Sequence, residues 1–316
     1  MAATWRIRFH MTDPFRGVLI LLVIVFAFAV STFGQIGLAD SMYMIFDRQG
    51  KPAALNAILN AMAENDVVFL GEEHDDAVAH AIQAELLRRA VESYSDQRRV
   101  TLSLEMFERD VQIVLDEYLR GLITEQHFLA SSRPWGNYKT DYRPLIEYAK
   151  EKRLDVIAAN APRRYVNMVA RNGRDSLTSL SPEAKKWLAP LPFPGPSAAY
   201  ADKFRKLMAG GGDPAAATRL DQMVYSQALW DATMADSITR YLAKNKNALV
   251  VHLNGTFHSE GRLGTVEQLM HYRPGTRALV VTIKSEKEFQ RFDSERHKGS
   301  GDFVVLTDAS QPRTKR

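Results

Sequence analysis

Two histidines in this sequence stand three residues after a glycine, in the pairs Gly71 with His74 and Gly255 with His258. Each pair directly follows a short apolar run that is typical of a buried strand. Glycine lets the chain turn sharply and brings the backbone close to a ligand, so the histidine can reach back over the strand end. Glu105 follows a third apolar run. If these strands are parallel, the three side chains share one edge of a sheet, where α/β proteins bind ligands.

Two imidazoles and a carboxylate can support two hydrolytic chemistries. They can hold a divalent ion such as Mn, Co or Zn with an open position for water. Alternatively, one histidine that is oriented by a glutamate can activate water directly. The His-Glu-x-x-His motif of many zinc peptidases is absent. The candidate metal ligands are His74, Glu105 and His258, and the candidate catalytic residues are Glu72, Glu73, His74, Glu105 and His258.

A third possibility is a haem pocket that uses a tyrosine or histidine as the iron ligand. The candidate cofactor-binding residues also follow predicted strands, except Asp231, which lies on a predicted long helix. They are Met106, Asn160, Asn254, Phe257 and Asp231. Asp231 could equally lie on a solvated helix face. The tyrosines considered as candidates to reach the pocket are Tyr138, Tyr142, Tyr165 and Tyr225.

Strands and helices alternate along much of the chain. The apolar runs predict strands at residues 67–70, 100–104, 155–159, 248–253, 277–283 and 303–306. Helical periodicity follows the first run, with Val78, Ile82 and Leu86 at four-residue spacing, and recurs before the third run. This alternation predicts an α/β fold, with a mostly parallel central sheet that helices cover on both faces.

Residues 176–246 interrupt the alternation. Ser181-Pro182 is typical of a helix start, and the proline-rich segment 190–196 must be a loop. A long helical pattern then runs from about residue 214 to 244. We expect a helical insertion here that forms a wall of the pocket. It belongs to a single domain of residues 40–310, which leaves a loose tail at 311–316.

The N-terminus predicts export. Arg6, Arg8 and Arg16 precede a charge-free stretch at residues 17–39, which ends in the small-x-small sequence Gly-Leu-Ala. This pattern is typical of a secretory signal peptide that is cleaved before Asp40, and an uncleaved membrane anchor is the alternative. We therefore expect a protein that is periplasmic or attached to the membrane by residues 1–39.

Composition excludes several classes of site. The chain has no cysteine, so it has no disulfide, no thiolate metal ligand, no cysteine nucleophile and no lipid-modified N-terminal cysteine. The formal net charge is only +4 over 316 residues, which gives no reason to expect nucleic-acid binding.

Six motifs, in this order along the chain, resemble the ChaN-like haem-binding uptake family of the Tiki superfamily. They are Val-Val-Phe-Leu-Gly-Glu-Glu-His at 67–74, Leu-Glu-Met-Phe at 104–107, Trp135 with Tyr138 and Tyr142, Ala-Asn-Ala-Pro-Arg-Arg at 159–164, Gln-Ala-Leu-Trp-Asp-Ala-Thr-Met-Ala at 227–235, and Asn-Gly-Thr-Phe-His at 254–258. The resemblance covers about residues 54–285. Erythromycin-esterase-like hydrolases are relatives of this superfamily.

The resemblance implies a bacterial surface or periplasmic protein of iron and haem acquisition, which binds haem and could do so between two protomers. It also implies a hydrolase ancestry, because Tiki-type peptidases hold a metal with two Gly-x-x-His motifs and a glutamate. His74, His258 and Glu105 match that pattern. Haem-uptake members are often lipoproteins, whereas this chain lacks the cysteine. Haem binding is therefore the leading hypothesis, and a metal-dependent hydrolase is the alternative.

Overall fold

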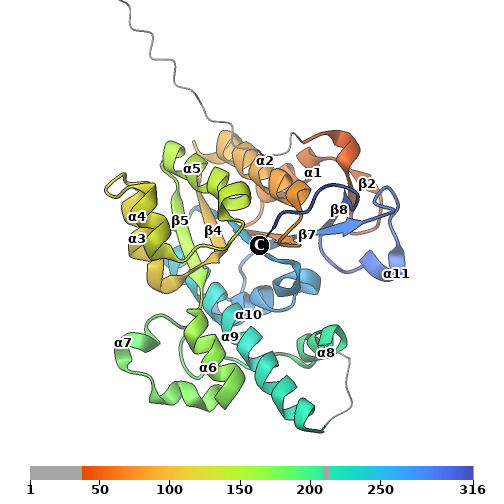
Figure 1. Ribbon diagram of the computed structural model, residues 1–316. Coiled ribbons are helices and arrows are strands. Elements are labelled where there is room, and N and C mark those ends of the chain that lie inside the picture. Colours follow the sequence, from red (N-terminus) through yellow and green to blue (C-terminus); the bar gives the residue numbers. More distant parts are fainter. Residues whose placement is uncertain (1–37, 209–213, 316) are drawn as a thin grey trace, which may run out of the picture. The chain divides into compact units, whose positions relative to one another are not determined.

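The computed structural model of the chain describes residues 38–208 and 214–315 (Figure 1). The predicted signal peptide or anchor lies almost wholly outside these residues. The described residues all belong to one compact unit. Among the described residues, none of the helices is both long and apolar enough to cross a membrane.

An eight-stranded sheet forms the centre of the fold, with the strand order β2-β1-β8-β7-β3-β6-β4-β5. The strands β3 to β8 all run parallel, whereas β1 is antiparallel to both of its neighbours, β2 and β8. The mostly parallel α/β fold predicted from the sequence is therefore confirmed. The strand bounds are β1 Tyr43–Asp47, β2 Pro52–Ala53, β3 Val67–Glu72, β4 Arg99–Glu108, β5 Asp155–Asn160, β6 Ala248–Gly255, β7 Ala278–Glu286 and β8 Phe303–Asp308.

Several strands are longer than the apolar runs predicted. Gly71 and Glu72 are the last residues of β3, and Glu105 lies inside β4 rather than after it. Asn160 ends β5, and Asn254 and Gly255 end β6 in the same way. Polar residues can continue a strand here because the backbone groups still pair with the neighbouring strand.

Helices pack on both faces of the sheet. The α-helix bounds are α1 Leu55–Met62, α2 Ala77–Tyr94, α3 Gln112–Leu119, α4 Glu125–Ser132, α5 Arg143–Lys152, α6 Arg163–Asn172, α7 Pro182–Lys185, α8 Ala198–Met208, α9 Pro214–Lys244, α10 Thr265–Tyr272 and α11 Ser294–His297. Single turns are η1 Asp40–Met42, η2 Arg109–Val111, η4 Arg174–Ser179, η5 Thr256–His258 and η6 Glu260–Arg262, and η3 Tyr138–Tyr142 is a π-helical turn.

The period-two alternation of the strands divides the core into two layers. Val68 and Leu70 of β3 pack with α1, α2 and α5 on one face, whereas Val67 and Phe69 pack with α9 and α10 on the other. Figure 1 shows α2 and α5 on the opposite side of the sheet from α9 and α10. Burial on both faces explains why these strands are continuously apolar.

The segment predicted as a helical insertion contains α7, α8 and α9, and α9 has the predicted bounds Pro214–Lys244. The tail that was predicted to be loose is described up to residue 315. Arg313 forms ion pairs there with Glu73 and Asp75, at 2.7 Å each.

Candidate functional site: two histidines around a buried glutamate

The central acid of the site is Glu105. β4 loses its regular pairing with β5 between Leu104 and Glu108, and such an irregularity can re-aim a side chain. The Glu105 side chain leaves the apolar core and is only 6% exposed. Its Oε2 accepts the backbone N–H of Gly255 at 2.6 Å, so β6, the neighbouring strand, holds the carboxylate in place.

His74 lies on one side of this carboxylate, in the loop after β3. Its Nδ1 is 2.9 Å from Glu72 Oε1, and its Nε2 is 4.0 Å from Glu105 Oε1. The imidazole packs edge-on against the Trp135 ring at a centroid distance of 4.8 Å and is 23% exposed. A carboxylate behind one ring nitrogen fixes the orientation of the other, so Nε2 is the nitrogen offered to a ligand.

His258 lies on the other side of Glu105, at the end of η5. Its Nε2 is 3.8 Å from Glu105 Oε1, and its Nδ1 is 2.8 Å from Asp231 Oδ1. Tyr200 and Thr265 donate hydrogen bonds to Asp231, which α9 contributes. Burial opposes a charge on this imidazole, but Asp231 and Glu105 outweigh it and raise the pKa of His258 to about 9.

A buried network of polar side chains holds Glu72, which in turn orients His74. Tyr142 donates to Glu72 Oε1 at 2.6 Å, and His80 Nδ1 lies 3.1 Å from Glu72 Oε2. His80 Nε2 is in turn 3.3 Å from Asp141. Burial alone would raise the pKa of Glu72, but His80 and His74 lower it well below its ordinary value. Burial likewise opposes protonation of His80, yet Glu72 and Asp141 raise the pKa of His80 to about 9.

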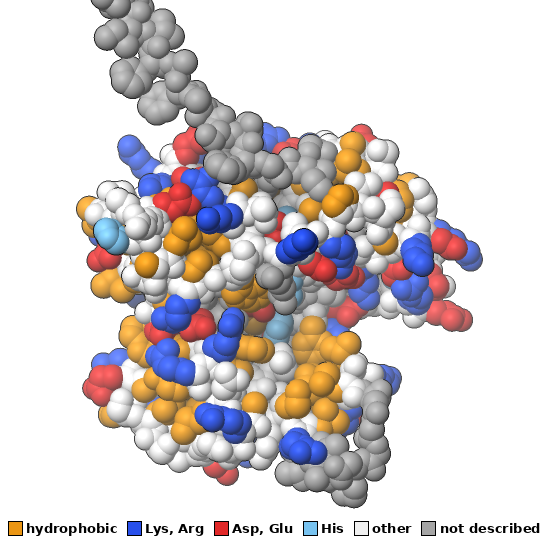
Figure 2. All heavy atoms as spheres, viewed as in Figure 1, with side chains coloured by type: hydrophobic (Ala, Val, Ile, Leu, Met, Phe, Trp, Pro, Cys, Tyr) orange, Lys and Arg blue, Asp and Glu red, His pale blue; other side chains and the backbone are white. Residues whose placement is uncertain are grey.

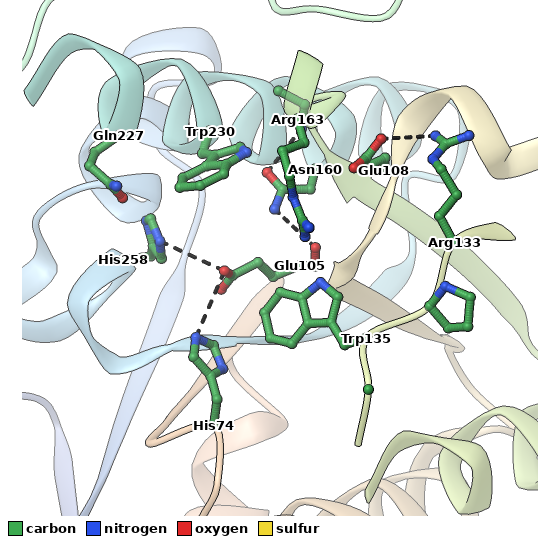
Figure 3. A pocket seen from close by; sticks show the side chains of 13 residues that line it. His74, Glu105, Glu108, Arg133, Trp135, Asn160, Arg163, Gln227, Trp230 and His258 are labelled. Atoms are coloured by element: carbon green, nitrogen blue, oxygen red, sulfur yellow. Dashed lines mark hydrogen bonds and ion pairs between the residues drawn. The ribbon is translucent and has the colours of Figure 1, made fainter. Parts of the chain in front are cut away.

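A cavity of about 530 Å³ opens in front of the two imidazoles, and we call it the histidine cavity (Figure 3). Its wall comes from the ends of β4 and β5, residues 133–136, and α9. The lining residues are His74, Glu105, Glu108, Arg133, Pro134, Trp135, Gly136, Asn160, Ala161, Arg163, Gln227, Trp230 and His258. In the space-filling view, histidine side chains are visible in this crevice, and lysine and arginine side chains lie along its borders (Figure 2).

A second cavity of about 400 Å³ shares His74, His258 and Gln227 with the first. Its other walls are more apolar and include Phe204 and Phe257. The two imidazoles therefore face two adjoining spaces.

The predicted catalytic residues fall into two groups. The structure brings Glu72, His74, Glu105 and His258 together, as described above. Glu73 faces the second cavity and the chain terminus, because its carboxylate accepts from Ser285 N at 3.2 Å and binds Arg313.

The predicted cofactor-binding residues are more scattered. Asn160 lines the histidine cavity and donates to Glu105 O at 3.0 Å, and Phe257 lines the second cavity. Met106 is buried in the core on the α2 face, and Asn254 is buried and donates to Ser259 Oγ at 2.9 Å. Asp231 reaches the site only through His258. Of these five residues, Asn160 and Phe257 alone line either cavity.

None of the described groups of three or more histidine, aspartate or glutamate side chains is arranged to hold a metal ion. The two Nε2 atoms lie 4.0 and 3.8 Å from the same carboxylate oxygen, with one Glu105 oxygen between them. Because no metal-holding group is found among the described residues, the metal alternative has no support there.

The histidine cavity does suit a haem. Its volume lies within the range of small-molecule and cofactor sites, and two tryptophan rings give it apolar walls. His74 offers a fixed imidazole nitrogen, which is the commonest protein ligand of haem iron. None of the tyrosines considered from the sequence lines this cavity. Tyr138 and Tyr142 are buried instead, and Tyr142 binds Glu72.

The sequence analysis gave no role to several residues that line the cavity, among them Arg133, Arg163 and Gln227. Arg163 was part of a recognised motif, Ala-Asn-Ala-Pro-Arg-Arg, directly after a strand that ends in a polar residue. That position was the available signal. Gln227 likewise begins the recognised motif at 227–235. Arg133 carried no comparable signal, because only the folded chain brings it to the strand ends.

Fold and site together define an α/β protein with a ligand cavity at the carboxyl edge of its sheet, where two carboxylate-bound histidines flank a glutamate. Residues 58–269 match the family described as haem-binding uptake, Tiki superfamily, ChaN, and the chain belongs to that family.

Individual relatives are more distant. A solved structure described as cofacial haem binding to ChaN of Campylobacter jejuni aligns with a TM-score of 0.67 and 18% identity, and the match covers 86% of this chain and all of that one. An open conformation of a mutant of erythromycin esterase EreC aligns with a TM-score of 0.45 and 14% identity, over 84% and 83% of the two chains.

A curated protein of Arabidopsis thaliana, RETICULATA-RELATED 5, chloroplastic, is 24% identical over 244 residues. The match covers 72% of this chain but 32% of the relative, so the chain spans about a third of that protein's length.

Proposed function

We propose that this protein is an exported haem-binding protein of iron uptake, which holds haem in the histidine cavity. The observation that carries the proposal is the His74 imidazole, which Glu72 orients and which faces a cavity between Trp135 and Trp230. Membership of the haem-binding family supports it, as does the likeness in fold to a ChaN structure described by its cofacial haem binding.

In this proposal His74 would be the residue that holds the haem. Haem would supply an iron that accepts a nitrogen donor. His74 is 23% exposed, against 7% for His258, so its Nε2 is the more accessible of the two. Trp135 and Trp230 would cover the apolar part of the ligand. The helical segment 176–246 serves as a pocket wall through Gln227 and Trp230 of α9.

Haemin titration of the full-length protein tests this. We expect saturable binding with a shifted Soret band, and at least a tenfold weaker affinity with a changed band in His74→Ala, because the iron loses its nitrogen ligand. His271→Ala, at an exposed histidine of α10, is the matched control and should titrate like the wild type. Absence of haemin binding to the wild type would reject the function. Normal binding by His74→Ala would reject only the ligand assignment.

Gly255→Ala provides an independent test of the position of His74. A Cβ on Gly255 would lie 2.6 Å from His74 Nε2, and its backbone φ of −60° is allowed for alanine, so the effect is steric. We expect the imidazole to move and haemin affinity to fall about tenfold. Gly195→Ala, where the nearest atom would be 3.4 Å away, should keep wild-type affinity in the same titration. Equal haemin affinities of Gly255→Ala and Gly195→Ala would contradict the proposed position of the His74 imidazole at the haem.

The homodimer expected from the resemblance is also part of the proposal. Cofacial haem binding in the C. jejuni protein's description motivates it. Sedimentation of the protein with and without haemin would detect association, and a haemin-loaded monomer would reject the homodimer.

The proposal that the protein is exported rests on Arg6, Arg8, Arg16 and the apolar stretch at 17–39. A mature N-terminus at Asp40 in the exported protein would support cleavage.

The hydrolase alternative keeps one favourable observation. Glu72 orients His74 at 2.9 Å, which is the arrangement of a histidine that activates water as a general base. Hydrolysis of a p-nitrophenyl ester by the wild type, lost in His74→Ala and kept in His271→Ala, would favour this activity. No hydrolysis above that of His74→Ala would count against it.

A further inference from the structure

Three arginines lie at or beside the rim of the histidine cavity, and two of them are paired within the protein. Arg133 binds Glu108 at 2.8 Å and Asp110 at 2.6 Å. Arg164 binds Asp110 at 2.5 Å. These two guanidinium groups are therefore committed to carboxylates of the β4 end and η2.

Arg163 differs from both. It is the first residue of α6, is exposed, and lines the cavity. In the part of the chain that the structure describes, its guanidinium has no hydrogen-bond or ion-pair partner. Figure 3 shows its side chain extending from the start of α6 into the cavity, toward Trp135.

Neither glutamate of the cavity pairs with the Arg163 guanidinium. Glu108 is bound to Arg133, and Glu105 is held by the Gly255 N–H between two imidazoles. A planar guanidinium with free donors matches a carboxylate in bidentate geometry. The cavity thus combines aromatic walls, an imidazole nitrogen and one unpaired arginine.

We propose that Arg163 binds a carboxylate of the ligand, which for haem is a propionate group. This inference rests on the proposed function. It assigns Arg163 to ligand specificity, because the residue would distinguish a porphyrin with free carboxylates from one without them. Arg133 and Arg164 have structural partners and are not part of this recognition.

The test compares Arg163→Gln with Arg164→Gln, which removes the same charge from the next residue. Each full-length variant is titrated with haemin and with haemin dimethyl ester, whose propionates are esterified. Arg163→Gln should bind haemin about tenfold more weakly, because charge-assisted hydrogen bonds are lost. Its affinity for the dimethyl ester should stay within twofold of the wild type. Arg164→Gln should match the wild type for both ligands, and thermal melts verify that both variants are folded.

Two results would overturn the inference while leaving haem binding intact: unchanged haemin affinity in Arg163→Gln, or an equal loss for haemin and its dimethyl ester. A wild-type protein that binds neither porphyrin would overturn the inference together with the proposed function. The wild-type titration alone separates these cases.

Discussion

Replacing Glu72 with glutamine is expected to lower the free energy of unfolding by about 3–5 kcal/mol, since it removes one partner from a buried charged network. Glu72 is 1% exposed and accepts from Tyr142 while it faces both His74 and His80. An amide in its place would either present N–H groups to His80 or lose an acceptor for Tyr142 and His74. Urea unfolding followed by circular dichroism at pH 6.5 measures the change.

Glu85→Gln is the matched control, because Glu85 lies on α2 and its pairs with Arg88 and Arg89 are at the surface. We expect a change of about 1 kcal/mol or less there. Similar losses in the two variants would mean that the Glu72 network adds no more stability than a surface ion pair.

The same variant should change the pH dependence of stability. The pKa of His80 is raised from 6.5 to about 9 in the folded protein, so its contribution is complete below pH 6.5 and is lost as the pH rises through 9. The pKa of Glu72 is lowered, so its contribution is present above pH 4.5 and is lost on acidification. Wild-type stability should therefore decline between pH 6.5 and 9. His258, whose pKa is also raised to about 9, adds to this decline in both proteins.

Glu72→Gln should flatten the part of the decline that belongs to His80, because the main cause of its raised pKa is gone. The difference between the two proteins should shrink from pH 6.5 to 9 by at most roughly 3 kcal/mol, at about 1.4 kcal/mol per pKa unit. Asp141 also raises the pKa of His80 and remains in the variant. If the two stability curves ran parallel between pH 6.5 and 9, Glu72 would not be the cause of the raised pKa of His80.

Replacing Arg109 with glutamine is the second large effect, again about 3–5 kcal/mol of unfolding free energy. Arg109 follows β4 and is buried, which lowers its pKa to about 10 despite the attraction of Asp236. Its guanidinium donates to Leu188 O and Asp236 at 2.9 Å each, to Thr233 O at 2.6 Å and to Ser237 Oγ at 2.5 Å. The substitution would leave a buried carboxylate and two backbone carbonyls without this donor.

These contacts attach α9 and the segment before it to the end of β4, so we expect faster amide hydrogen exchange in α9 as well as lower stability. The control is Arg240→Gln, which also removes a partner of Asp236, at 2.8 Å, but from a side chain that is 50% exposed. That change should cost less than about 1 kcal/mol. Exchange in α9 that is unaltered by Arg109→Gln would show that other contacts hold the helix.

Local sequence patterns were sufficient to predict the strands and the long helix that position the site residues. The apolar runs before Gly71 and Gly255 became β3 and β6, and the pattern of the long helix became α9. These elements were predictable because strand burial and helix periodicity depend on neighbouring residues. β1 and β2 were missed: β2 has only two residues, whereas β1 does contain a short apolar run, Met44-Ile45-Phe46, which was overlooked. The lengths of β3 to β6 were also missed, because pairing continues through polar residues.

Residue type and position also indicated His74, His258 and Glu105, since each follows an apolar run of the sequence. The partners of these residues were harder to find. Asp231 was ambiguous on a helix that could have faced solvent, and His80, which contacts Glu72, was not among the candidate residues. A helix position does not reveal which buried group lies opposite it, because that depends on how the helix packs on the sheet.

The amino-acid sequence by itself determined the α/β class, the family and the order of the polar strand ends along the chain. Only the tertiary structure decided that β6 lies between β3 and β4, with Glu72 level with Gly255 and the Gly255 N–H bound to Glu105. That order places the glutamate between two histidines from distant parts of the chain. Strand order follows from long-range packing of both sheet faces, and residues that are 150 positions apart carry no local trace of it.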